Sequence, residues 1–355
     1  MSEWRYTNLG EVVEIKYGKD HKHLATGKIP AYGSGGVMRH VDAALYDDES
    51  ILIPRKGSLN NIIYESKPFW TVDTMFWSKI DKTLAHPKFL FYQLTEIDYM
   101  NLNVGSAVPS LTVPVINAIE ISLPPLEEQK AIASVLSSLD DKIDLLHRQN
   151  TTLEAMAETV FRQWFVEEAQ EDWEEVPLGD VIETTSGGTP SRSNMDFYLN
   201  GTINWVKSKE LSGSFILDTE EKITVEALKK SSAKLLAKNS ILIAMYGATV
   251  GEYAIISKEM TCNQAVCALK PNEKYPYTFL FLYVKSYQDE LINMAVGSAQ
   301  QNISQLLIKQ LPVPTCYEKI SDFHKQTEPF FEKIKNNSSQ IQTLEKLRDT
   351  LLPKL

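Results

Sequence analysis

The same ordered set of short motifs occurs twice in the chain, and this internal repeat restricts the possible fold more than any other feature. The matched segments are WRYTNLGEVVEIKYG (4–18) with WEEVPLGDVIETTSG (173–187), ILI (51–53) with ILI (241–243), KFLF (88–91) with TFLF (278–281), VGSA (104–107) with VGSA (296–299), and TLEAMAETVF (152–161) with TLEKLRDTLL (343–352). The first pair is 169 residues apart and the others 190 to 192, so the second copy holds 21 extra residues between Gly187 and Ile241. Solenoid units are about 20–50 residues long. The longer repeat therefore indicates a duplicated domain with a tail, and two similar domains without a shared task are the alternative.

Each globular part is predicted to mix helices and strands. Short segments rich in β-branched and aromatic residues are typical of strands. These are Ile51–Ile53, Ile62–Tyr64 and Trp70–Trp77 in the first copy, and Ile241–Ala244, Tyr253–Ile256 and Ala265–Leu269 in the second. Helices are predicted over Phe89–Tyr99 and Phe279–Leu291. The first globular part ends where Ile119, Ile121 and Leu123 alternate before two prolines.

Each globular part is followed by a tail with an apolar stripe at heptad spacing, which predicts a long helix. The stripe is Leu139, Ile143, Leu146, Leu153, Ala157, Val160 and Trp164 in the first tail, and Ile320, Phe323, Thr327, Phe330, Ile334, Ile341, Leu344 and Leu351 in the second. A helix of roughly 40 residues is about 60 Å long. Two such stripes can cover each other, or each helix can fold back on its own domain. Asn150 lies within the first stripe, where it either sets the register of the helices or is partly solvated.

These features predict an α+β fold. Two globular mixed α/β domains are separated by an antiparallel pair of long coiled-coil helices, with pseudo-two-fold internal symmetry. The expected boundaries are 1–125 for the first domain, 126–168 for the first helix, 169–314 for the second domain and 315–355 for the second helix.

Composition predicts a soluble cytoplasmic protein. Hydrophobic residues make up 43% of the chain and charged residues 23%. No run of about 18 apolar residues is present, and the first ten residues lack the apolar core of a signal peptide. Three cysteines do not form a disulfide framework, which fits a reducing compartment.

The net charge of −10 disfavours an unassisted nucleic-acid binder, because phosphate contacts require lysine and arginine. Residues 126–170 hold four basic and nine acidic side chains. DNA is therefore not expected along the first long helix. The globular parts can still carry local basic patches, and a partner subunit can supply more positive charge.

Catalytic and metal-binding motifs are missing from the sequence. It has neither a GxxxxGK[ST] phosphate-binding loop nor an Asn-Pro-Pro-aromatic methyltransferase motif. Cys262 and Cys267 have no second pair, and His21 and His23 have no acidic or cysteine partner at a characteristic spacing, so neither pair predicts a metal site. We interpret 47–49 as a solvated turn. The chain is expected to contain no catalytic site, no metal and no cofactor.

Taken together, the motifs of both copies resemble those of a known family, the specificity subunits of Type I restriction-modification systems. The resemblance rests on the following segments, which extend over nearly the whole chain: LGEVVEIKYG (9–18), YGSGG (32–36), ILIPRKGS (51–58), PFWTVDTMFW (68–77), ISLPPLEEQKAIASVLSSLDDKID (121–144), FRQWFV (161–166), SGGTPS (186–191), INWVKSKEL (203–211), AMYGATVGEYAI (244–255), TCNQAVCAL (261–269) and LRDTLLPKL (347–355). The second copy departs from the pattern, with LPVPTCYEK where the first has LPPLEEQK.

The resemblance implies that each globular part is a target recognition domain for one half of a split, asymmetric site in double-stranded DNA. The two helices would set the spacing between the half-sites. It also implies that two modification subunits dock on the body and methylate adenine with S-adenosylmethionine. Restriction subunits would add translocation and cleavage, with ATP and magnesium bound to partners. A duplicated protein-binding scaffold without DNA specificity and a stand-alone nuclease or methyltransferase with a divergent site are the alternatives.

Reading bases requires donors and acceptors in loops. In the first copy the candidates are Lys16, Lys19, Ser34, Arg39, Arg55, Lys56, Ser58, Asn60 and Asn61. In the second copy they are Thr189, Ser191, Arg192, Lys207, Ser208, Lys209, Tyr246, Thr249, Asn263 and Gln264. Each can instead be a solvated surface residue or a turn former. Glycines 33, 35 and 36 either expose amides to a phosphate or form a plain turn.

Overall fold

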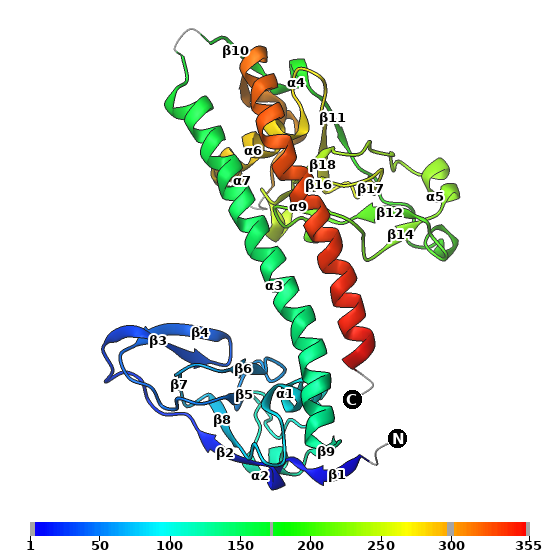
Figure 1. Ribbon diagram of the computed structural model, residues 1–355. Coiled ribbons are helices and arrows are strands. Elements are labelled where there is room, and N and C mark those ends of the chain that lie inside the picture. Colours follow the sequence, from blue (N-terminus) through cyan, green and yellow to red (C-terminus); the bar gives the residue numbers. More distant parts are fainter. Residues whose placement is uncertain (1–3, 171–172, 297–301, 353–355) are drawn as a thin grey trace. The chain divides into compact units, whose positions relative to one another are not determined.

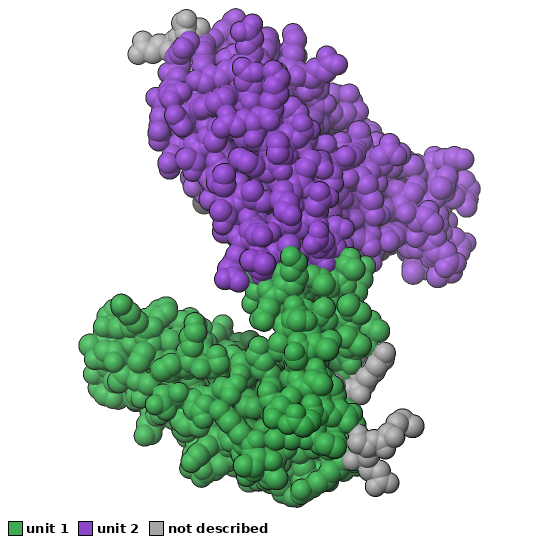
Figure 2. Space-filling model, viewed as in Figure 1, with its two compact units in different colours: residues 1–144, 343–355 green, residues 145–342 purple. Residues whose placement is uncertain are grey.

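The chain forms two compact units in the computed structural model, which describes residues 4–170, 173–296 and 302–352. Unit 1 holds residues 1–144 and 343–355, and unit 2 holds residues 145–342 (Figure 2). Most of the predicted second VGSA match, at 296–299, lies outside the described residues.

Unit 1 is built on two small sheets and a two-stranded ribbon. Its strands are β1 (Arg5–Asn8), β2 (Val13–Tyr17), β3 (Thr26–Gly33), β4 (Gly36–Val41), β5 (Ser50–Pro54), β6 (Ile63–Glu65), β7 (Trp70–Thr71), β8 (Met75–Ile80) and β9 (Glu120–Leu123). Its helical segments are η1 (Leu9–Glu11), α1 (Pro87–Thr95), α2 (Val113–Asn117) and the beginning of α3 (Leu126–Arg162). The strand orders are β2-β8-β5-β6, β4-β3-β7 and β1-β9. All five residues of β5 are buried, as expected of an unbroken apolar run inside a sheet.

Unit 2 repeats this plan with additions (Figure 1). Its strands are β10 (Glu175–Pro177), β11 (Glu183–Ser186), β12 (Ile203–Val206), β13 (Phe215–Ile216), β14 (Lys222–Ile223), β15 (Ile241–Ala244), β16 (Tyr253–Ile256), β17 (Thr261–Cys262), β18 (Val266–Lys270) and β19 (Pro312–Pro314). Its helical segments are η2 (Gln163–Glu167), α4 (Leu178–Val181), η3 (Met195–Phe197), η4 (Ser208–Glu210), α5 (Val225–Lys230), η5 (Gly247–Thr249), α6 (Tyr277–Ser286), α7 (Gln288–Val296), α8 (Gln305–Gln310) and most of α9 (Tyr317–Leu351).

Strand order confirms the duplicated mixed α/β fold that the repeat predicts. The main sheet of unit 2 runs β11-β18-β15-β16-β13, which is the order of unit 1 with one strand added at the edge. Its second sheet, β14-β12-β17, corresponds to β4-β3-β7. In both small sheets the central strand has one antiparallel and one parallel neighbour. The added strand β13 lies within the stretch that the repeat identifies as longer in the second copy.

Helices α3 and α9 pack against each other in antiparallel orientation within each unit. In unit 2, Asn150 of α3 contacts Asn337 of α9, while Glu168, beyond the end of α3, pairs with Lys319 near the start of α9. In unit 1, the Asp140 carboxylate accepts from the Arg348 guanidinium at 3.0 Å. Each helix also packs on its own domain: the Tyr92 hydroxyl of α1 donates to Asp140 of α3 at 2.7 Å, and the ring centroids of Phe331 in α9 and Phe281 in α6 are 5.5 Å apart. The last part of α3 packs on the second domain, where the ring centroids of Phe161 and Phe279 are 5.7 Å apart. Both arrangements considered for the stripes therefore occur together.

Among the strands and helices predicted inside the two domains, three differ from the structure by more than one residue at an end. The single strand expected over Trp70–Trp77 is two strands, β7 and β8, which belong to different sheets. Between them the Met75 amide donates to the Val72 carbonyl at 3.0 Å and closes a turn. The helix predicted over Phe89–Tyr99 begins and ends earlier, as α1, and the one over Phe279–Leu291 is divided into α6 and α7. Apolar periodicity does not locate such breaks, because the residues on both sides remain buried.

Candidate nucleic-acid interface

Three loops of unit 2 converge at one end of its main sheet. The loop after β11 contacts the turn before β18, because the Gly188 amide donates to the Cys262 carbonyl at 2.9 Å. The Thr189 hydroxyl donates to Gln264 in the same turn. The loop after β15 joins them where the Met245 amide donates to the Ala265 carbonyl at 2.8 Å. The predicted candidates from Thr189 to Arg192, from Tyr246 to Thr249 and at 263–264 thus share one surface.

The equivalent three loops meet in unit 1. The Gly18 amide after β2 donates to the Met75 carbonyl at 3.0 Å, and the Lys19 amide donates to Thr71 at 2.8 Å. The Arg55 amide after β5 donates to the Thr74 carbonyl at 2.8 Å. The turn between β7 and β8 therefore occupies the place that residues 263–265 occupy in unit 2.

A close backbone approach explains why both copies have glycine at the end of the first motif. A Cβ added to Gly18 would lie 2.0 Å from the Val72 carbonyl oxygen, and one added to Gly187 would lie 2.2 Å from that of Cys262. No side chain fits at such distances. The two glycines hold the same pair of loops together in each copy.

Arg55, the foremost candidate of the first copy, is partly occupied within the protein. Its Nε donates to the Asp73 carbonyl at 2.7 Å, and its guanidinium lies 3.7 Å from the Asp73 carboxylate. The guanidinium also lies 6.0 Å from the Tyr17 ring centroid. These contacts orient a half-buried side chain. Arg55 can position the loop as well as contact a ligand.

Other polar candidates of unit 1 bind the loops to one another. Asn61 donates to the Ser34 carbonyl at 2.8 Å, which fastens the β3–β4 turn to the loop after β5. Asn60 accepts from the Tyr99 amide at 3.1 Å, and Arg39 donates to the Leu24 carbonyl at 3.0 Å. Ser58 is exposed.

The lysine candidates of unit 1 differ in their surroundings. Lys16 pairs with Glu14 on the same strand. Lys19 and Lys56 are exposed, and neither side chain has an ion pair with any residue in the described parts of the chain. Among the lysine candidates of unit 1, Lys19 and Lys56 are therefore the ones whose positive charge is not neutralised by a nearby carboxylate of the described residues.

The basic candidates of unit 2 lie among carboxylates. Lys207 lies 3.0 Å from Glu220 and 2.9 Å from Glu221, and Lys209 lies 2.8 Å from Glu220. Arg192 donates to Glu221 at 2.6 Å. The pKa of Glu221 is lowered by Arg192 and then by Lys207, and hydrogen bonding to Glu221 raises the pKa of Lys207. These lysines therefore contribute little net positive charge to the surface.

The remaining candidates of unit 2 are small polar groups on the same loops. The Ser191 and Ser193 hydroxyls lie 2.8 Å apart, and the Thr249 hydroxyl donates to the Tyr246 carbonyl at 3.3 Å. Asn263 accepts from the Ala265 amide at 3.1 Å and shapes its own turn. Ser208 begins η4, and Tyr246 is 44% exposed, which leaves its ring available to a ligand.

Sequence reasoning missed the acidic partners and the exposed apolar residues of these surfaces. Glu220 and Glu221 are visible in the sequence, but only folding brings them to Lys207 and Lys209. Val37 and Met38 in the β3–β4 hairpin are 51% and 59% exposed. The apolar pair that directly follows the glycine-rich turn at 33–36 was the available signal.

The histidine, cysteine and acidic residues for which the sequence predicted no metal site can be compared with their surroundings in the structure. In the described parts of the chain, no group of three or more histidine, cysteine or acidic residues is placed to hold a metal ion. Asp48 and Glu49 both pair with Lys82, at 2.7 and 2.9 Å. Gly36 has a φ of 111°, which the β3–β4 turn requires.

The helix seam contains a polar contact at Asn150, in unit 2. The Asn337 side-chain amide donates to the Asn150 oxygen at 2.9 Å, and the Asn150 amide donates to the Ser338 hydroxyl at 3.3 Å. Asn150 is 8% exposed and Asn337 is fully buried. Of the other predicted seam residues, Ile143, Leu146, Ile334 and Ile341 are buried, and half-buried are Leu139, Leu153, Leu344 and Leu351.

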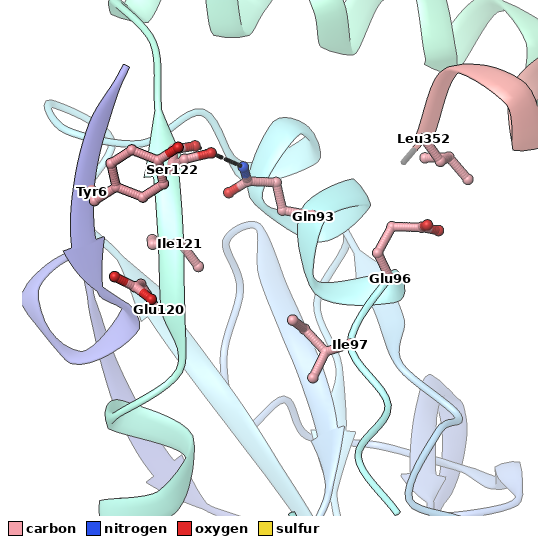
Figure 3. A pocket seen from close by; sticks show the side chains of 8 residues that line it. All are labelled: Tyr6, Gln93, Glu96, Ile97, Glu120, Ile121, Ser122 and Leu352. Carbon is pink, nitrogen blue, oxygen red and sulfur yellow. Dashed lines mark hydrogen bonds between the residues drawn. The ribbon is translucent and has the colours of Figure 1, made fainter. Parts of the chain in front are cut away.

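Figure 3 shows a pocket of about 250 Å³ in unit 1, between α1, the β1–β9 ribbon and Leu352, which directly follows α9. On one side of it the Gln93 side-chain amide donates to the Ser122 carbonyl at 2.6 Å. None of the predicted DNA-binding residues lines this pocket. The candidate interface is therefore a surface of loops and not a cavity.

Within the described residues, no helix is both long and apolar enough to cross a membrane.

The comparisons with known proteins agree with the duplicated fold. The chain is 27% identical to the Type I restriction enzyme MjaIX specificity subunit of Methanocaldococcus jannaschii, over 90% of this chain and 79% of that protein. It is 25% identical to the Type I restriction enzyme HindI specificity subunit of Haemophilus influenzae, over 76% of each.

A crystal structure of the S subunit of a Type I restriction-modification system from M. genitalium has the same fold. Its TM-score is 0.72 at 18% identity, covering 99% of this chain and 95% of that one. The family model for the Type I restriction modification DNA specificity domain matches residues 1–155 and again residues 170–345. Because both copies of the repeat match this model, the chain belongs to the Type I restriction-modification DNA specificity domain family.

Proposed function

We propose that this chain is the sequence-specific DNA recognition subunit of a Type I restriction-modification enzyme, with one DNA half-site read by each copy of the repeat. The observation that carries the proposal is the pair of equivalent three-loop surfaces. Both are built on the same strand order, and both are supported by a glycine that no other residue can replace without a steric clash. Duplicated surfaces of this kind suit two neighbouring targets on one duplex.

The two surfaces present different chemistry, which supports an asymmetric target. After the equivalent strands β5 and β15, unit 1 has Arg55 and Lys56 where unit 2 has Met245 and Tyr246. In the adjoining turn, Asp73 corresponds to Gln264, because the Met75→Val72 and Val266→Asn263 backbone hydrogen bonds are equivalent. Arginine prefers guanine, whereas amide side chains pair with adenine. Different side chains on the same framework therefore predict two different half-sites.

In this proposal residues 1–125 and 169–314 are the two target recognition domains, and the helices at 126–168 and 315–355 set the spacing. Helix α3 has 37 residues. At about 1.5 Å per residue it is roughly 55 Å long, more than one turn of DNA at ~34–36 Å. A continuous helix is stiff enough to hold such a spacing.

The same helices would dock two modification subunits, and restriction subunits would complete the enzyme. The chain itself would carry out no reaction. S-adenosylmethionine, ATP and magnesium would be bound by the partners. The net charge of −10 and the paired lysines of unit 2 favour such an assembly, because the positive charge needed along the DNA backbone would come mainly from other subunits.

The test is to express the chain together with its cognate modification subunit and to map methylated adenines in the host genome. We expect methylation at a single split sequence with two different halves. The modification subunit without this chain is the control and should methylate no such sequence. Replacing residues 1–120 by those of another family member should change one half-site only. Unchanged methylation without this chain, or a change in both halves, would contradict the proposal.

A further inference from the structure

Arg192 differs from Lys207 and Lys209, the other basic candidates of unit 2, in how it is held. Its guanidinium carbon lies 4.4 Å from the ring centroid of Tyr198 and 4.9 Å from that of Trp205. Stacking on aromatic rings orients a planar guanidinium but uses none of its N–H groups. Arg192 is thus fixed in direction while most of its donors remain available.

The rings that hold Arg192 are themselves anchored in the recognition loop. Trp205 is 2% exposed, and its indole N–H donates to the Gly188 carbonyl at 3.0 Å. The Tyr198 hydroxyl donates to the Pro190 carbonyl at 2.6 Å. The Gly188–Arg192 loop therefore wraps around the same two rings on which its own arginine stacks. This arrangement lowers the entropy lost when the guanidinium binds a ligand.

One nitrogen of Arg192 is bonded within the protein, and the side chain stays accessible. Nη1 donates to Glu221 at 2.6 Å, and the side chain is 52% exposed. Within the described residues, Nε and Nη2 of Arg192 have no hydrogen-bond acceptor. By contrast, the Lys207 side chain is only 16% exposed and faces two carboxylates, so its charge is already paired within the protein.

The charges around Arg192 favour a base over a phosphate as its ligand. Three cations, Arg192, Lys207 and Lys209, lie among three carboxylates, and the cluster has no net charge. The carboxylates, which are Glu210, Glu220 and Glu221, would repel a DNA phosphate. Arg192 can still form directional hydrogen bonds in this neutral cluster, because these depend on its exposed N–H groups.

We propose that Arg192 reads a guanine in the half-site recognised by the second copy, with Tyr198, Trp205 and Glu221 as its positioning residues. A guanidinium has donors only, and guanine presents two acceptors, O6 and N7, in the major groove. Adenine offers one acceptor beside a donor at the same edge, so it matches less well. The inference rests on the proposed function and names one base contact within it.

The experiment uses the chain reconstituted with its cognate modification subunits and the mapped target of the wild-type complex. Methylation rates are measured on DNA in which each base pair of both half-sites is changed in turn. R192K keeps the charge but lacks the planar fork. We expect it to lose about 5- to 150-fold of discrimination at one G·C pair of a single half-site, and to leave the other half-site unchanged.

Two further variants test the positioning residues. Y198L removes the stacking ring and should weaken the preference at the same base pair, whereas Y198F keeps the ring and should retain most of it. K229Q removes one exposed positive charge from the same unit and is the matched control, with no change at any single position expected. Thermal unfolding of each variant shows whether unit 2 is intact.

Two results would overturn the inference. If R192K kept full discrimination, while the neutral variant R192Q weakened binding to all sequences alike and lowered the salt dependence by about one unit, Arg192 would contact a phosphate. If discrimination were unchanged at every position, the Arg192–Glu221 pair would be only a surface ion pair. Failure of the wild-type complex to methylate any split site would instead contradict the proposed function.

Discussion

Replacing Asn150 by leucine should destabilise unit 2, and replacing Asn337 as well should restore most of the loss. In the wild type, the buried Asn337 amide donates to Asn150 at 2.9 Å. The single variant leaves that amide with only a long contact of 3.4 Å to Gln149. A buried polar group left without its partner costs about 1–3 kcal/mol, whereas replacing both partners by apolar groups is nearly neutral or stabilising.

The expected shift in melting temperature follows from the size of unit 2. For a unit of about 200 residues, 1 kcal/mol corresponds to roughly 2–4 °C. N150L should therefore lower the Tm by about 2–12 °C, and N150L/N337L should melt near or above the wild type. Calorimetry of the full chain measures both. Q340L, at an exposed position of α9, is the control and should leave the Tm almost unchanged.

The test depends on the coupling energy between the two substitutions. Residues in direct contact show interaction energies of about 0.5–3 kcal/mol, and independent residues show values near zero. If the effects of N150L and N337L simply add, the two asparagines are not coupled, and Asn150 is a solvated seam position instead of a register-setting one.

Three further predictions concern the loops and the helices. G18A should cost at least about 2 kcal/mol, because its Cβ would overlap the Val72 carbonyl, while G35A, with open space around it, should stay within ~0.5 kcal/mol in urea unfolding. Burial alone would raise the pKa of Asp218, but hydrogen bonds from Asn204 and Lys222 lower it to about 2. A lowered folded-state pKa stabilises the protein above the unfolded value of 3.8, and this contribution is lost as the pH falls toward 2. The Tm difference between wild type and D218N should therefore shrink between pH 4 and pH 2, and a constant difference would contradict the assignment. Inserting one heptad into both α3 and α9 should lengthen the DNA spacer by about three base pairs, since seven residues add about 10 Å and each base pair ~3.4 Å; methylation mapping would show whether both half-sites are retained.

Much of the architecture could be predicted from local sequence patterns. The unbroken apolar runs at 51–53 and 241–243 are buried central strands, as patterns of this kind predict. The heptad stripes are helices of 37 and 35 residues. Burial imposes these patterns directly on neighbouring residues, so they can be recognised without knowing the fold.

The internal repeat itself determined that the chain contains two equivalent units and that the second is longer. Strand order agrees, with β13 as an added edge strand in the longer copy. The repeat also marks Gly18 and Gly187 as equivalent, although only the structure shows the carbonyl groups of Val72 and Cys262 against them. The sequence shows that a residue type recurs, and the fold shows the contact that requires it.

Contacts between distant residues were decided by the tertiary structure alone. Glu221 and Arg192 are 29 residues apart, and nothing in either segment indicates that they meet. Arg55 reads as an unoccupied loop cation in the sequence, yet it is bound to Asp73, which lies in a turn between two sheets. Asn150 is conspicuous in its stripe, but its partner Asn337 can be identified only once the two helices are aligned. Local patterns record which side chains are buried, whereas the pairing of charges and amides depends on how the chain brings remote segments together.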